Sequence, residues 1–91
     1  MKIYLVTFKM DDGRYDNMVD AIKKFDYWSR ITETTWCVKS DINTTEKFKQ
    51  AIKANCPLND SERLFVVNIT DSPWASSNIP TEVADWLKDE V

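Results

Sequence analysis

The feature that most constrains this chain is the apolar run Ile3–Phe8, which is followed by an Asp/Gly-rich turn and then by apolar residues at helical spacing. A short apolar run is typical of a strand, and a spacing of three or four residues is typical of the buried face of a helix. The residues with helical spacing are Tyr15, Met18, Val19, Ile22 and Phe25. The chain therefore begins with a strand that leads into a helix.

The same order of elements returns in the second half of the chain. A pair of antiparallel strands is predicted at Tyr27–Thr32 and Thr35–Ser40, because both are rich in β-branched and aromatic residues and only Glu33-Thr34 separates them. A second helix follows and ends before Pro57, and a last strand is predicted at Arg63–Thr70. The order βαββαβ predicts an α+β fold, the ferredoxin-like sandwich of one sheet against helices.

One domain is expected over residues 1–91, with a core over 1–70 and a docking tail over 71–91. The tail contains a short helix that Thr81 is expected to cap and that places Trp86 on an apolar stripe. A helix of two or three turns is not stable alone in water. The tail must therefore dock, either on the sheet of its own subunit or across a dimer.

Two further helix caps are predicted from local sequence. Asp11 or Asp12 precedes the first helix and is expected to accept hydrogen bonds from its free backbone N–H groups. Asn43 and Glu46 have the Asn-x-x-Glu spacing of a capping box at the start of the second helix.

The charge balance limits the kinds of partner that the chain can bind. The chain has 12 Lys and Arg against 15 Asp and Glu, a net charge of −3, which argues against non-specific binding to phosphate backbones. A local basic strip stays one hypothesis, because lysines lie on the two helices that share one face of the predicted fold. The alternative is that they are ordinary solvated residues. The candidates for the strip are Lys23, Lys24, Lys47, Lys49 and Lys53.

Cys37 and Cys56 fit no metal-binding spacing and are expected to be reduced core residues of a cytoplasmic protein, with redox sensing as the alternative. No apolar stretch is long enough for a membrane span or a signal peptide, so neither membrane insertion nor secretion is expected.

A homodimer is expected, because a domain of 91 residues buries only roughly 60 to 65% of its unfolded surface and association would add stability. Four Trp residues in so short a chain suggest that some lie in an interface. The interface candidates are Tyr4, Trp28, Trp36, Trp74 and Trp86. Trp28 and Trp36 can equally be core residues, because aromatic residues dominate both settings. A rival hypothesis is an RNA-recognition module in which Tyr4 and Trp36 stack on bases, although the strand with Trp36 lacks the Gly-rich signature of such modules.

Catalytic groups are few. The chain has no His, which excludes Ser-His and Cys-His nucleophiles and His-based metal sites. The only tight acidic group near a strand end is Asp11, Asp12 and Asp16, for which turn formation and capping is the simpler interpretation.

Four segments resemble the small bacterial and phage proteins called SinR-like, which are similar to the CRISPR-associated Cas-two proteins and the VapD toxins. The segments are Tyr4–Phe8, Thr34–Lys39, the Asn59-Asp60 turn with Leu64–Val67, and Asp85–Lys88. The resemblance implies a ferredoxin-like homodimer. It also implies a setting in a phage, a mobile element or a defence-related locus.

The nuclease branch of that group carries an Asp at the end of the first strand, where two copies hold a divalent metal across the dimer. The resemblance puts Lys9 at this position, and a charged Lys cannot ligate a cation. The expected function is therefore a non-catalytic, homodimeric accessory protein that binds a protein or nucleic-acid partner and needs no cofactor. The alternative is an endoribonuclease in which Asp11 or Asp12 holds Mg²⁺ or Mn²⁺.

Overall fold

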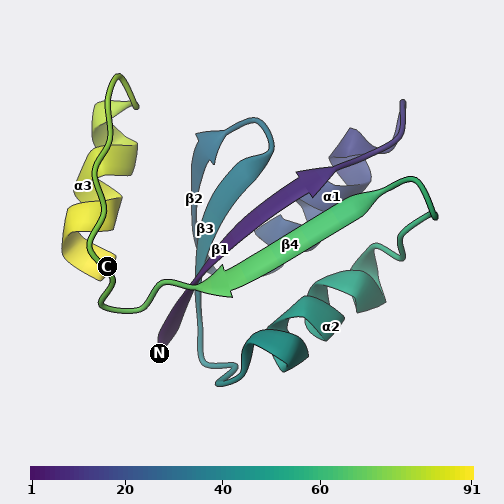
Figure 1. Cartoon of the computed structure of the whole chain (residues 1–91), viewed down its shortest axis with the longest axis horizontal. Helices are drawn as coiled ribbons and strands as arrows, with labels where there is room; N and C mark the ends of the chain where they lie inside the picture. The colour runs from purple at the N-terminus through teal and green to yellow at the C-terminus, as the bar shows by residue number, and fades with distance from the viewer.

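The computed structural model describes all of residues 1–91 and contains one antiparallel sheet and three helices (Figure 1). The sheet has the strand order β2-β3-β1-β4, so β1 and β3 are central and β2 and β4 are edges. The predicted α+β class is confirmed. The elements are β1 (Lys2–Lys9), α1 (Tyr15–Lys23), β2 (Tyr27–Thr32), β3 (Thr35–Ser40), α2 (Thr45–Asn55), β4 (Arg63–Asn68) and α3 (Thr81–Glu90).

The main core lies between the sheet and the helices α1 and α2. Side chains alternate along a strand, and Tyr4, Val6 and Phe8 of β1 all point to the helix side. Tyr4 stacks on Phe48 of α2 with 4.2 Å between ring centroids, and its hydroxyl donates a hydrogen bond of 2.6 Å to the carbonyl oxygen of Ile42. Trp36 of β3 joins the same core. Each large side chain buried here stabilises the fold by about 1.5–3 kcal/mol relative to an exposed one.

The C-terminal tail docks on the other face of the same sheet. Val83 and Leu87 of α3 pack against Cys37 of β3 in a second, smaller core. Lys39 of β3 donates to a Glu90 carboxylate oxygen at 2.6 Å and fixes the end of α3. Figure 1 shows α3 next to β2, with most of β4 on the other side of the sheet. Of the two docking modes expected for the tail, the structure has the one within its own subunit.

Two predicted helix caps are wrong by one residue. The hydroxyl of Thr44, not the side chain of Asn43, caps α2 by accepting a hydrogen bond of 3.2 Å from the N–H of Lys47. Thr44 has the extended backbone that a capping residue needs, with φ −126° and ψ 144°. The predicted cap Thr81 is already the first helical residue of α3, because Pro80 occupies the capping position and has no side chain that can accept a hydrogen bond.

No helix of the protein has both the length and the apolar character required to cross a membrane.

Candidate functional site

The loop between β1 and α1 contains the two carboxylates considered as metal ligands. Gly13 turns the chain there with φ +80°, a backbone conformation that glycine adopts at little cost. The first helix has Arg14 at its capping position and no capping hydrogen bond from a side chain. The expected capping by Asp11 or Asp12 is therefore wrong. Asp12 is exposed, and Asp11 faces a different partner.

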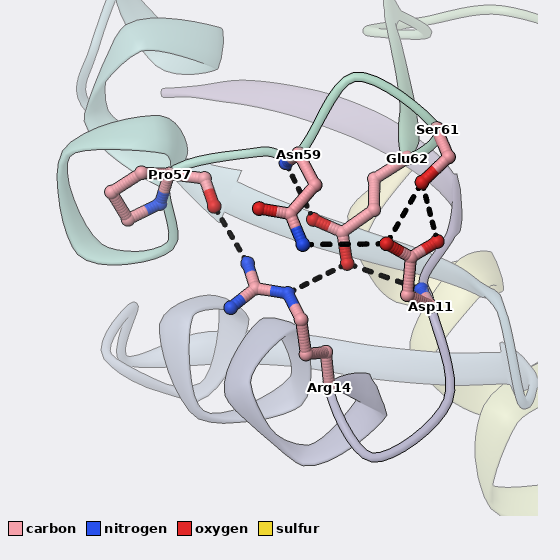
Figure 2. A network of polar contacts seen from close by, with 6 residues as sticks. All are labelled: Asp11, Arg14, Pro57, Asn59, Ser61 and Glu62. Atoms are coloured by element: carbon pink, nitrogen blue, oxygen red, sulfur yellow. Dashed lines mark hydrogen bonds and ion pairs between the residues drawn. The ribbon is translucent and has the colours of Figure 1, made fainter.

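The Asp11 carboxylate connects its loop to the loop between α2 and β4 (Figure 2). The hydroxyl of Ser61 lies 2.7 and 2.8 Å from the two carboxylate oxygens, and the side-chain amide of Asn59 donates at 3.3 Å. Both oxygens of Asp11 are thus engaged by donors from 48 to 50 residues away in the sequence. No group of three or more Asp, Glu, His or Cys residues in the structure is arranged to hold a metal ion.

Glu62 is the buried centre of the same network. Its side chain has no exposed surface and accepts a hydrogen bond of 2.8 Å from Nε of Arg14. It also accepts from the backbone N–H groups of Asn59 at 2.8 Å and Asp11 at 3.1 Å, as Figure 2 shows. The Arg14 hydrogen bond first, and then the two N–H donors, hold the pKa of Glu62 at about 2, because each favours the ionised form.

This network is a structural clamp between two loops. Arg14 completes it by donating through Nη2 to the carbonyl oxygen of Pro57 at 2.7 Å. A carboxylate that is ionised at neutral pH has no proton to give, and the buried side chain of Glu62 presents no surface to a substrate, so Glu62 is a poor general acid or base. Glu62 could not be identified from the sequence, because a single Glu in a polar turn before a strand carries no distinguishing signal.

The end of β1 is cationic. Lys9 is the last residue of β1 and lies directly opposite Arg63, the first residue of β4. Both side chains are exposed, and neither forms an ion pair within the chain. Two neighbouring positive charges at this position repel a metal cation and attract an anionic group.

Next to this pair, one part of the sheet is uncovered. The residues Thr7, Lys9, Arg63, Phe65 and Val67 share the sheet side that faces away from α1 and α2, and none of them belongs to the core that α3 forms on that side with Cys37 and Leu5. We call these five residues the open face. Phe65 is 62% exposed and Val67 is 37% exposed. Thr7, Lys9, Arg63 and Phe65 also line a shallow depression of about 410 Å³.

The structure assigns the five interface candidates to three different environments. Tyr4 is 0% and Trp36 is 1% exposed, so both are core residues, and the predictions that they form an interface or stack on RNA bases are wrong. They were misjudged because only the packing of the helices decides which side of a strand is covered. Trp74 and Trp86 are half-buried in the tail's own core. Trp28 is 37% exposed.

The five lysines of the proposed basic strip have different surroundings. The Lys23 ammonium lies 5.3 Å from the ring centroid of Trp28, so it is directed toward β2. Lys49 forms an ion pair of 2.9 Å with Glu46, and this hydrogen bond is the main reason why the pKa of Glu46 is lowered. Lys24 and Lys47 are exposed, and Lys53 is half-buried. One continuous strip stays a prediction.

Cys37 and Cys56 are both free and buried, in agreement with the expectation of reduced core thiols. They belong to the cores on opposite faces of the sheet, so they cannot form a disulfide with each other. Burial raises the pKa of Cys37 to about 11 and also raises that of Cys56. A protonated, buried thiol reacts slowly with oxidants, which disfavours the redox-sensing alternative.

A scan against protein-family models gave no match to this chain, and a search of curated proteins gave none either.

Proposed function

We propose that this protein is a non-catalytic interaction protein that works as a homodimer. The observation that carries the proposal is the open face, where Phe65 and Val67 of an edge strand are exposed on the same side of the sheet as Lys9 and Arg63. A large exposed aromatic residue next to another apolar residue is typical of a surface that another molecule covers.

The chemistry of the candidate catalytic residues supports a non-catalytic role. Asp11 is held by Ser61 and Asn59, Glu62 is buried and accepts three hydrogen bonds, and both thiols are buried.

The partner of the dimer is proposed to be anionic. Lys9 and Arg63 leave two unpaired cations beside the exposed ring of Phe65. Cations with a neighbouring aromatic ring suit a single-stranded nucleic acid, because phosphates bind the cations and bases stack on the ring. An acidic protein segment is the other partner class with the required charge.

The strand order supports the proposal that the fold is ferredoxin-like. In the order β2-β3-β1-β4, each helix α1 and α2 connects two strands that have one other strand between them. The resemblance to SinR-like, Cas-two and VapD proteins supports a role as an accessory of a phage, a mobile element or a defence system. A cytoplasmic location is part of the same proposal.

The dimer is tested by light scattering on the full chain at micromolar concentrations. We expect a mass of about twice the 10.6 kDa of one chain. Phe65→Ser should raise the dissociation constant at least about tenfold, a loss of about 1.4 kcal/mol in the free energy of association. Tyr27→Ser is the matched control, since Tyr27 is 54% exposed on the other edge strand, and it should leave the dimer unchanged. The proposal would be ruled out if the unmodified protein were still a monomer at a concentration 100-fold above the micromolar range. It would also be ruled out if Phe65→Ser and Tyr27→Ser changed the dissociation constant equally.

The alternative is a metal-dependent endoribonuclease that uses Asp11 or Asp12. We expect no metal-dependent cleavage of single-stranded RNA and no stoichiometric heat on titration with Mn²⁺, because the oxygens of Asp11 are already engaged. Asp11→Ala should cost about 1 kcal/mol of folding free energy through lost hydrogen bonds. For stability, Asp12→Ala is the control within the same loop, because Asp12 is exposed. Cleavage that either variant abolishes would establish the nuclease instead.

A further inference from the structure

The outer side of β4 has free hydrogen-bonding groups. β4 pairs only with β1, and the N–H of Ile69 donates to the carbonyl oxygen of Ile3 at 2.8 Å. In an antiparallel pair, the backbone groups of every second residue point to the partner strand. Counting back from Ile69, the odd-numbered residues of β4 therefore point to β1. The N–H and C=O groups of Leu64, Val66 and Asn68 point outward.

Apart from the charge of Arg63 at its first residue, this edge has little of the usual protection against pairing. The register of β4 on β1 is regular over its full length, and β4 contains neither Pro nor Lys. Natural edge strands usually carry a bulge, a Pro or an inward-pointing charge that prevents association. The opposite edge does carry such a feature, because β2 has a register shift between Arg30 and Thr32 and lies next to α3.

We propose that two copies of the chain pair through β4 in an antiparallel arrangement with a two-fold axis at Val66. This inference rests on the proposed function, since it requires a homodimer. In this register Val66 lies opposite its own copy and Leu64 lies opposite Asn68 of the second copy. All outward backbone groups of the three residues are then paired, and the two four-stranded sheets become one.

The side chains of the open face identify a second copy as the occupant. With the axis at Val66, Phe65 of one copy lies opposite Val67 of the other, so the two most exposed apolar residues of β4 contact each other twice. Arg63 lies opposite Ile69, and the two Arg63 side chains are separated by about 20 Å at 3.4 Å per residue. The strand thus matches itself in both hydrogen bonds and side chains, without opposing like charges.

The pairing joins the two open faces into one surface. Phe65 and Val67 of both copies lie in its middle, with Lys9 and Arg63 toward either side. Edge pairing covers the flanks of Phe65 and Val67 that face the other copy. Because side chains of a strand stand perpendicular to the sheet, their outer surface is left for an anionic partner to cover.

Amide hydrogen exchange measured by NMR on the full-length dimer tests the pairing. The N–H groups of Leu64, Val66 and Asn68 should exchange at least about 100-fold more slowly than free amides, because pairing protects them. The N–H groups of Phe65 and Val67 are the internal control, since they point to β1 and are protected in either case. Fast exchange of the three outward amides in a proven dimer would overturn the pairing and leave the proposed function intact. A monomer would overturn both.

Two double variants test the register. Combining Phe65→Lys with Val67→Lys places like charges opposite each other and should raise the dissociation constant at least about tenfold over the second variant. The second variant, Phe65→Glu with Val67→Lys, places opposite charges across the axis at Val66 and should dimerise more tightly than the first variant, although more weakly than the unmodified protein. If the axis lay at Phe65 or Val67 instead, like charges would meet in both variants and both would dissociate.

Discussion

Replacing Trp36 by Ala is expected to lower the free energy of unfolding by about 3–5 kcal/mol, the largest loss of any change described for this chain. Trp36 is one of the largest fully buried side chains and packs between the sheet and the helices. Its indole N–H donates to the carbonyl oxygen of Glu33 at 3.3 Å, so the ring has both apolar and polar partners. Urea denaturation followed by circular dichroism measures the loss.

Trp28→Ala is the matched control. The Trp28 ring lies 5.2 Å from the Trp36 ring but is 37% exposed, so its removal leaves a gap open to water and should cost about 1–2 kcal/mol. The difference between the two variants should be the same at low and high protein concentration, because Trp36 acts within one chain. If both variants lost the same free energy of unfolding, or if the loss for Trp36→Ala grew on dilution, Trp36 would instead contribute to the dimer interface.

The bounds of the two hairpin strands could be predicted to the residue, whereas the side of each strand that is buried could not. β2 and β3 have the predicted bounds, because β-branched and aromatic content around a two-residue turn is a local signal. Which side of β1 is covered depends on where α1, α2 and α3 pack. Tyr4 was therefore assigned to the surface from sequence and is fully buried.

The open face could not be predicted for the same reason. Leu64–Val67 is apolar at every position, so the sequence does not distinguish the half-buried Leu64 and Val66 from the exposed Phe65 and Val67. Buried and exposed residues alternate along β4 because the core under α1 and α2 covers one side of this edge strand, whereas the core under α3 contains none of its residues. The clamp could not be predicted from the sequence either, because Arg14 and Glu62 are 48 residues apart. Long-range pairing of this kind leaves no local pattern.

Acidification is expected to weaken the fold through Glu62. The pKa of Glu62 is about 2 in the folded protein, below its ordinary value of 4.5. The unfolded chain therefore binds more protons between these values, and stability falls as the pH falls. The contribution of Glu62 is fully present above about pH 4.5 and is lost as the pH approaches 2. Thermal unfolding measured at intervals from pH 7 to pH 2 follows this loss.

Glu62→Gln separates this effect from general acid denaturation. The variant keeps the shape of the side chain but leaves Arg14 without its carboxylate, so the melting temperature at pH 7 should fall by about 10 °C. Its melting temperature should then change less than that of the unmodified protein between pH 4.5 and pH 2, because the titrating group is absent. Asp12→Asn is the control, since Asp12 is an exposed carboxylate of the same clamped loop, and it should follow the unmodified protein at every pH. Parallel profiles for Glu62→Gln and the unmodified protein would mean that the clamp of Asp11, Arg14 and Glu62 does not hold the two loops together in solution.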